Sequence, residues 1–211
     1  IYTLSLHDAL PISSLRTVVL SLSRLKEITD IDAENLTISV QAGVITLTAI
    51  QAAADKGLLF TVDPASKAAS SIGGNISENA GGPFAFEYGT TLDNLLSYRM
   101  VLPTGELIEV RRVDHPRHKI MPDETAVFEV LDESGAVLET LRLKGNEIRG
   151  TGLGKDVTNK FLGGLPGVQK EGVDGIVADA TFTVYSSLPH SRVLCLEFNE
   201  EIGRASCRER V

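Results

Sequence analysis

Alternating apolar and polar residues predict two β-hairpins in the middle of the chain. In Tyr98–Arg112 the alternation reverses around Pro103-Thr104-Gly105, and in Val127–Leu143 it reverses around Glu133-Ser134-Gly135. Period-two alternation is typical of strands with one buried face, and Pro and Gly are typical of the turns that join them. We therefore expect two antiparallel pairs here.

Further strands are expected on both sides of these hairpins. The segments are short and rich in β-branched and aliphatic residues, with turn-forming residues at their ends. They are Thr17–Leu25, Leu36–Gly43, Leu58–Asp63, Gly175–Tyr185 and Arg192–Phe198, with an acidic turn, Asp30–Asn35, between the first two.

Helical patterns are few. Thr46–Gly57 is rich in alanine, begins at a threonine and ends at a glycine, which predicts a helix. Thr90–Ser97 predicts a short capped helical turn, and Lys155–Leu162 predicts another helix. Because strands and helices do not alternate in a regular βαβ repeat, the pattern favours an α+β fold over a doubly wound sheet.

The composition limits the class of protein. The 211 residues carry a net charge of −8, with 43% hydrophobic and 5% aromatic residues. An acidic chain with few aromatic residues is a poor partner for nucleic acid. No apolar run approaches the roughly 20 residues that span a bilayer. Two cysteines are too few for a disulfide framework, so we expect a cytoplasmic protein, whether free or peripheral to the membrane.

The most unusual stretch is SSIGGNISENAGG, Ser70–Gly82, with four glycines and two asparagines in thirteen residues. Consecutive glycines let main-chain N–H groups converge on an anion without a cationic side chain. The stretch lacks the Gly-Lys-Ser/Thr of a Walker A loop and the G-x-G-x-x-G spacing of a Rossmann turn. By itself it fits either a diphosphate-binding loop or a tight crossing of two chain segments.

The surrounding residues favour the first interpretation. Asp63–Leu96 reads DPASKAASSIGGNISENAGGPFAFEYGTTLDNLL, which resembles the D-P-x-S, G-G-N-x-x-x-N-A-G-G and Y-G-x-T-x-x-N-L-L run of FAD-linked oxidases. These share the flavin-binding fold of vanillyl-alcohol oxidase and p-cresol methylhydroxylase (PCMH). Gly164–Tyr185 is similar to their second flavin segment, with an E-G-x-x-G-I pattern at Glu171, Gly172, Gly175 and Ile176. Within this family, the sequence resembles in particular the D-lactate dehydrogenase and glycolate oxidase flavin subunits.

This resemblance implies which residues contact FAD. Gly73, Gly74 and Asn75 would donate backbone N–H groups to the pyrophosphate. Gly175 and Ile176 would offer main-chain contacts from the second segment, where Glu171 is either part of the motif or a turn carboxylate. The remaining positions would line the cofactor or the wall beside it: Pro64, Ala65, Ser66, Asn79, Gly81, Gly82, Tyr88, Gly89 and Thr90. No histidine or cysteine supports a covalent link, so we expect non-covalent FAD.

The two ends fit poorly with the sequence between them. Residues 1–13 and 201–211 resemble translated sequencing adapters, so we interpret them as non-native tails, with natural disordered tails as the alternative. Residues 14–200 are then a partial PCMH-type FAD-binding domain, with a hairpin insertion at about 124–144. The family's first flavin loop, of R-G-x-G-T type, and its cap domain are not found in the sequence. The catalytic residues therefore stay unassigned, and we expect the fragment alone to be nearly inactive.

Histidine and cysteine side chains suggest no further site. His115 and His118 lack a third ligand of suitable spacing, and Pro116 argues against a helix that presents both. We interpret them as exposed loop residues, with substrate contact as the alternative. His190 fits a surface turn and Cys195 a buried core thiol. Without a four-cysteine cluster, the sequence predicts no metal site and no iron–sulfur centre of its own.

The resemblance implies a flavin-dependent oxidoreductase. Its substrate would be a small 2-hydroxy acid such as D-lactate or glycolate, oxidised by hydride transfer to FAD. The electron acceptor is open, and iron–sulfur modules of the parent chain are one candidate. Three alternatives also stay open: an alcohol or phenol oxidase of the same fold, a cofactor-binding module without turnover, and an α+β domain whose glycines only turn corners.

Overall fold

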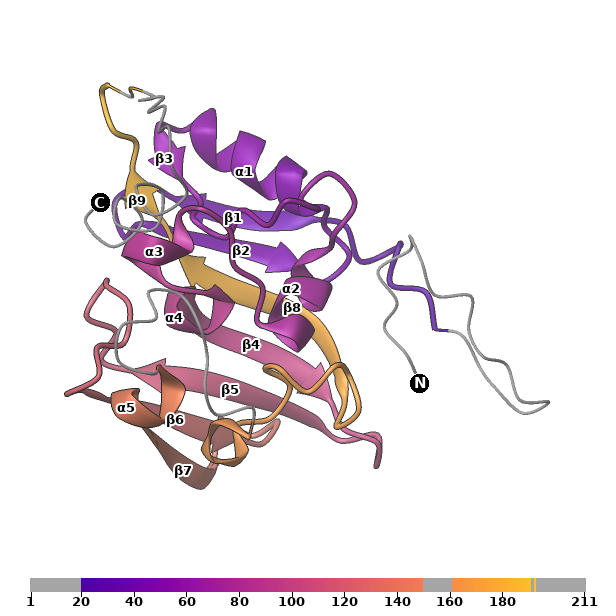
Figure 1. Cartoon of the computed structure of the whole chain (residues 1–211). Coiled ribbons are helices and arrows are strands. Elements are labelled where there is room, and N and C mark those ends of the chain that lie inside the picture. The colour runs from indigo at the N-terminus through magenta and orange to yellow at the C-terminus, as the bar shows by residue number, and fades with distance from the viewer. Residues whose placement is uncertain (1–19, 150–160, 191, 193–211) are drawn as a thin grey trace, which may run out of the picture.

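The alternation of the hairpins builds one large antiparallel sheet. In the computed structural model, which describes residues 20–149, 161–190 and 192, seven strands lie in the order β1-β2-β8-β4-β5-β6-β7 (Figure 1). Within the same residues, a second antiparallel sheet consists of β3 and β9. The α+β class expected from the sequence is confirmed, because antiparallel strands and short helices are mixed without a βαβ repeat.

The strands of the large sheet are β1 (Ile28–Asp32), β2 (Thr37–Gln41), β4 (Leu95–Val101), β5 (Leu107–Val113), β6 (Thr125–Leu131), β7 (Val137–Lys144) and β8 (Ile176–Thr183). The small sheet pairs β3 (Leu58–Leu59) with β9 (Tyr185–Ser186). The helices are α1 (Thr46–Ala54), α2 (Ile72–Glu78), α3 (Ala85–Tyr88), α4 (Thr91–Asn94), α5 (Gly145–Ile148) and the 3-10 turn η1 (Leu162–Gly164). Among the described residues, no helix is long and apolar enough to cross a membrane.

Both expected hairpins are confirmed. β4 pairs with β5 around a turn that ends at Gly105, and β6 pairs with β7 around a turn that ends at Gly135. Both glycines have positive φ, +91° and +83°, a conformation that other residues rarely adopt. In the second turn the Asp132 carboxylate accepts the N–H groups of Ser134 and Ala136. The β6–β7 hairpin extends the sheet at one edge, and its status as an insertion stays a prediction.

The N-terminal strand was expected too early. Residues 20–25 form no strand. β1 begins at Ile28 and ends at Asp32, inside the segment expected to be a turn. The turn is shortened because the Asp32 carboxylate accepts the N–H groups of Glu34 and Asn35, both at 2.9 Å. Pairing of Ile31 with Ile38 then sets the register of β1 on β2. The hydrogen bonds that this one aspartate accepts therefore confine the turn to residues 33–36, which is shorter than the acidic composition suggested.

The first half of the glycine-rich stretch is a helix rather than a loop. Ile72–Glu78 forms α2, capped at its start by the Ser71 hydroxyl and ended by Asn79 in the left-handed conformation, with φ 51°. The sequence analysis missed this because glycine is a poor helix former. Burial of Ile72 and Ile76 on one face supplies the stabilisation that local propensity lacks.

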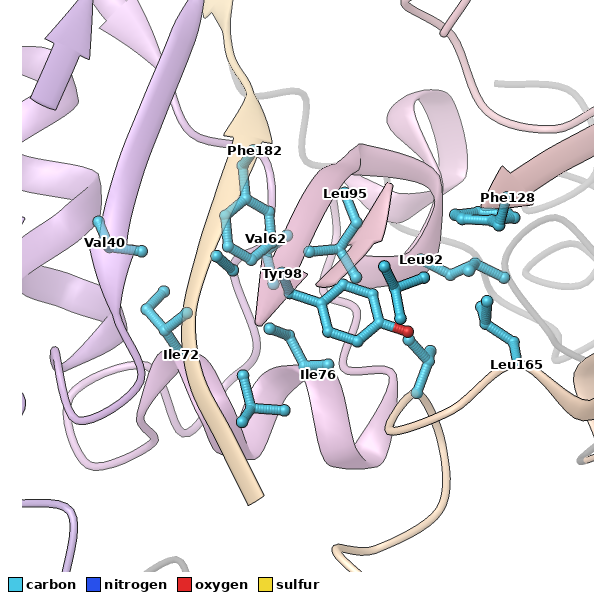
Figure 2. Packing of buried hydrophobic residues seen from close by; sticks show 14 of the residues in the cluster. Val40, Val62, Ile72, Ile76, Leu92, Leu95, Tyr98, Phe128, Leu165 and Phe182 are labelled. Carbon is cyan, nitrogen blue, oxygen red and sulfur yellow. The ribbon is translucent and has the colours of Figure 1, made fainter. Parts of the chain in front are cut away.

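The core lies between the large sheet and the helices that cover one of its faces. Figure 2 shows Ile72 and Ile76 of α2 directed toward the sheet near Val40 and Tyr98. Nearby, Phe182 of β8 meets the ring of Phe60 edge-on at 5.2 Å. Fully burying each such side chain contributes about 1.5–3 kcal/mol. The alternate residues of the same strands turn to the other face, which carries polar pairs: Ser39 with Thr181, Arg99 with Asp179 and Arg111 with Glu129.

Several expectations are only partly tested. Of the expected strand Leu58–Asp63, only Leu58 and Leu59 pair with another strand, and Phe60–Asp63 continue as buried chain. Most of the expected helix at 155–162 and of the strand at 192–198, including Cys195, lies outside the described residues. The same holds for residues 1–19 and 193–211, so the domain limits at 14 and 200 stay a prediction.

Candidate cofactor site

The start of α2 does not offer free amides to a pyrophosphate. The N–H of Gly73 donates to the carbonyl of Ala42 at 2.8 Å, and the N–H of Gly74 donates to the Ser71 hydroxyl at 3.3 Å. The N–H of Asn75 donates to the Ser71 carbonyl at 2.9 Å. Each of these three amides has an acceptor within the chain, and their expected contact with the pyrophosphate stays a prediction.

Close packing explains why residue 73 is a glycine. A Cβ built on Gly73 would lie 3.0 Å from the Cβ of Ala42, which follows β2. The side chain of Asn75 is buried and donates to the Thr46 hydroxyl at 2.8 Å. Gly73 and Asn75 therefore fix α2 against the sheet and α1, the tight crossing that the sequence left open as an alternative.

A second group of expected residues forms one continuous wall. It consists of Asp63–Ser66, Gly81–Phe84 and Gly89–Thr90, and we call it the glycine wall. A Cβ on Gly82 would lie 2.0 Å from the carbonyl oxygen of Asp63, so only glycine permits this contact. The Asp63 carboxylate accepts the N–H of Phe84 at 3.3 Å, and a Cβ on Gly81 would lie 3.3 Å from the Thr90 methyl group.

The glycine wall carries amides without an intramolecular partner. Among the described residues, the N–H groups of Ala65, Ser66, Gly81 and Gly82 have no hydrogen-bond acceptor. Buried or half-buried N–H groups in folded proteins almost always have one. Ala65 and Ser66 are exposed, whereas Gly82 is buried and Gly81 is half-buried. These four amides are therefore able to donate to an acceptor outside the chain.

Asn79 joins the two sequence motifs. Its side-chain oxygen accepts the N–H of Leu92 at 2.9 Å, and its side-chain nitrogen donates to Gln169 at 3.1 Å. The backbone N–H groups of Gln169 and Glu171 donate to carbonyls at the end of α2. Glu171 is an exposed turn residue. Gln169 was not expected, and only its position inside the second motif could have suggested it.

Gly175 and Ile176 make their described contacts within the sheet. A Cβ on Gly175 would lie 2.7 Å from the carbonyl of Val101 and 2.4 Å from the end of the Met100 side chain. Ile176 begins β8 and pairs with Val101. Their proposed contact with FAD stays a prediction, whereas their packing against β4 is a feature of the fold.

A buried carboxylate holds the end of the glycine wall. Asp93 is fully buried, and its carboxylate accepts the Thr90 N–H at 2.7 Å and the Thr90 hydroxyl at 3.1 Å. It also accepts the N–H of Ile120 at 2.8 Å and pairs with Arg149, which is 4% exposed. Gly89 has no room for a side chain because the Asp93 carboxyl group occupies that space. The sequence predicted only that Thr90 begins a capped helical turn, and it did not predict the contact between Asp93 and Arg149.

His115 is half-buried and lies beside Asp93, so it is not an exposed loop residue. Its Nε2 lies 2.6 Å from the Asp93 carbonyl, and its Nδ1 accepts the Arg117 N–H at 2.8 Å. Burial, with Arg112 nearby, lowers the pKa of His115 to about 4. His118 is exposed and lies 3.4 Å from Glu124. Over the described residues, no three His, Cys, Asp or Glu side chains gather where they could hold a metal ion.

Aromatic rings line one end of the glycine wall. The rings of Tyr88 and Tyr185 lie 4.5 Å apart, and Phe84 meets Tyr88 at 6.3 Å. The hydroxyl of Tyr185 lies 3.3 Å from the side-chain oxygen of Asn94. Burial, with Asp93 nearby, raises the pKa of Tyr185 to about 12. Tyr185 therefore stays protonated at neutral pH.

Comparison with known families identifies the domain. The model of the FAD binding domain family matches residues 5–111, half of the chain. The chain belongs to this family. The matched residues include α2 and the whole glycine wall. FAD, the cofactor expected from the sequence, is confirmed by this match, whereas the individual residues expected to contact it stay a prediction.

Curated relatives of this FAD binding domain are named as an oxidase subunit and as dehydrogenases. The chain is 46% identical over 91 residues to glycolate oxidase subunit GlcD of Bacillus subtilis, covering 43% of the chain and 19% of the relative. It is 40% identical over 93 residues to D-lactate dehydrogenase of Anaerostipes hadrus, covering 44% and 19%. A D-2-hydroxyglutarate dehydrogenase of Xanthomonas citri is 41% identical over 93 residues, covering 44% and 20%. The match thus spans about a fifth of these relatives.

A solved structure supports the fold over a longer part of the chain. Alkyldihydroxyacetonephosphate synthase superposes with a TM-score of 0.52 at 20% identity, covering 83% of this chain and 24% of that one. At this identity the likeness concerns the fold alone. It extends the match beyond residue 111, so the later strands belong to the same architecture as the FAD binding domain.

Proposed function

We propose that the full-length protein is an FAD-dependent oxidoreductase that oxidises a small 2-hydroxy acid and holds its FAD non-covalently. The observation that carries the cofactor part is the set of unpartnered N–H groups at Ala65, Ser66, Gly81 and Gly82, all within the closely packed glycine wall. Bound FAD would supply the hydride-accepting chemistry. The amides would bind oxygen atoms of the cofactor, and Tyr88, Gly89 and Thr90 would limit its position.

The substrate class rests on the relatives. Glycolate, D-lactate and D-2-hydroxyglutarate, which the relatives' names give, each carry a hydroxyl group on the carbon next to a carboxylate. A reaction at that shared group is the simplest common chemistry. An acceptor outside this domain, with iron–sulfur modules as one candidate, would take the electrons. The low cysteine content of the chain supports a cytoplasmic setting.

Anaerobic reduction of the bound flavin tests the proposal. The full-length protein is purified and mixed without oxygen with D-lactate, glycolate, D-2-hydroxyglutarate or L-lactate. We expect the visible flavin absorbance to bleach with at least one of the first three acids and the yellow colour to leave the polypeptide on denaturation. Bleaching only by an alcohol or phenol would favour the related oxidase reaction, and bound FAD that no compound reduces would favour a binding module.

A further inference from the structure

Asp93 and Arg149 form a buried ion pair that connects separate parts of the chain. Besides Arg149 and Ile120, the Asp93 carboxylate binds both the N–H and the hydroxyl of Thr90. Arg149 also donates to the carbonyl of Ile120 at 2.7 Å. The pair therefore ties the glycine wall to the loop at Ile120 and to the residue that follows α5.

The position of Thr90 depends on this carboxylate. Thr90 begins α4 through a capping box in which the Asp93 side chain accepts the Thr90 N–H. α4 has only four residues, too few to be stable without such contacts. The Asp93 carboxyl group also fills the space beside Gly89. A shift of Asp93 would therefore move Gly89 and Thr90 together.

Arg149 compensates the buried negative charge of Asp93. A fully buried carboxylate is costly unless an opposite charge and hydrogen bonds compensate it. Arg112 lies near but binds only the backbone carbonyl of Asp93, at 3.1 Å. Among the described residues, Arg149 is the cation in direct contact with the carboxylate.

We propose that Arg149, acting through Asp93, is a positioning residue that fixes Gly89 and Thr90 in the geometry that binds FAD. This rests on the proposed function, because the glycine wall matters for binding only if it faces the cofactor. Arg149 lies nearly 60 residues from Thr90 in sequence and outside both flavin motifs. Its effect on FAD would be transmitted through the carboxylate rather than by contact.

Binding of FAD to the full-length apoprotein tests the proposal with four variants. Arg149→Met leaves a buried unpaired carboxylate and is expected to raise the Kd for FAD at least tenfold. Arg149→Lys keeps the charge but loses the fork-shaped guanidinium, and we expect it to raise the Kd for FAD about threefold. This variant replaces Arg149→Met in the test if Arg149→Met does not fold. Val130→Ala weakens the buried side of β6 away from the wall and should leave the Kd within twofold. Chemical unfolding of each apoprotein gives its stability in parallel.

The double variant Asp93→Asn with Arg149→Met separates positioning from stability. It removes both charges, so stability should recover relative to Arg149→Met, whereas the Kd and the visible circular dichroism of bound FAD should stay altered. Recovery of the FAD affinity together with the stability in the double variant would overturn the proposal. An unchanged Kd in Arg149→Met would overturn it as well. Wild-type protein that binds no FAD would overturn the proposed function and the inference with it, whereas the other contrary results overturn the inference alone.

Discussion

The side chain of Asn79 donates to the side chain of Gln169 at 3.1 Å, although 90 residues separate them in sequence. Asn79 ends α2 inside the first flavin motif, and Gln169 lies inside the second. The contact brings the two motifs together on one side of the sheet. Asn79 has a left-handed backbone conformation, which asparagine adopts more readily than most residues, at the point where the two chain segments meet.

Replacing Asn79 should destabilise the junction of the two motifs. Asn79→Gly keeps the left-handed conformation but loses the hydrogen bonds to Leu92 and Gln169. We expect a loss of about 2 kcal/mol, since each buried group left unpaired costs about 1–3 kcal/mol. Asn79→Ala should cost about 1 kcal/mol more because of its positive φ. Urea unfolding measures both, and equal stability of the two variants would contradict the conformational part.

Gly82 and Gly74 should respond differently to a methyl group. Gly82→Ala places a Cβ 2.0 Å from the Asp63 carbonyl, so the glycine wall must open. We expect a loss of about 3 kcal/mol or more, as for severe overpacking, and weaker FAD binding. Gly74→Ala is the matched control, since its nearest contact is the Ser71 hydroxyl at 3.3 Å and alanine favours a helix. Unfolding and FAD titration of both variants check this, and equal losses would refute the assignment of close contact to Gly82.

His115 should make stability depend on pH between about 6.5 and 4. Its pKa is lowered from 6.5 to about 4 in the folded protein, so the unfolded chain binds a proton in this range and the folded chain does not. Stability from this group is therefore present above pH 6.5 and falls as the pH drops toward 4. The loss should be on the order of 2 kcal/mol. Unfolding of wild type and His115→Gln between pH 7 and 5 measures it, and identical slopes would contradict the prediction.

Arg112 should be dispensable for stability, unlike its neighbour Arg149. Its side chain is buried and, among the described residues, makes no ion pair such as the one between Arg149 and Asp93, and burial lowers its pKa. Replacing a buried ion that lacks good partners with an apolar residue of similar size is often neutral or stabilising. We expect Arg112→Met to change the free energy of unfolding by less than about 1 kcal/mol, against about 3–5 kcal/mol for Arg149→Met. A large loss in Arg112→Met, measured by chemical unfolding, would show that its bond to the Asp93 carbonyl matters more than its burial.

The sequence was informative where the signal is local. Turn residues at Gly105 and Gly135 predicted both hairpins, and alanine content predicted α1. The same logic failed at α2, because glycine propensity argues against a helix that tertiary contacts stabilise. The prediction of a strand at Leu20–Leu25 was also wrong, because the composition is typical of a strand but no neighbouring strand pairs with this segment.

The candidate site divides in the same way. The motifs identified the family, the cofactor and the segments that form the glycine wall. Which amides are free could not be read from the motif, because it depends on whether an acceptor such as the Ala42 carbonyl lies opposite. Asp93 lay within a predicted helical turn and Arg149 carried no prediction, yet the fold buries both.

By itself, therefore, the sequence determined the α+β class, the hairpins and the FAD binding family, since these depend on periodicity, turn chemistry and short ordered motifs. Only the tertiary structure decided that Gly73 and Gly74 belong to a packed helix, that Asn79 meets Gln169, and that Asp93 is paired with Arg149. The physical reason is that hydrogen-bond partners and burial are set by segments distant in the chain, which come together only when the sheet forms.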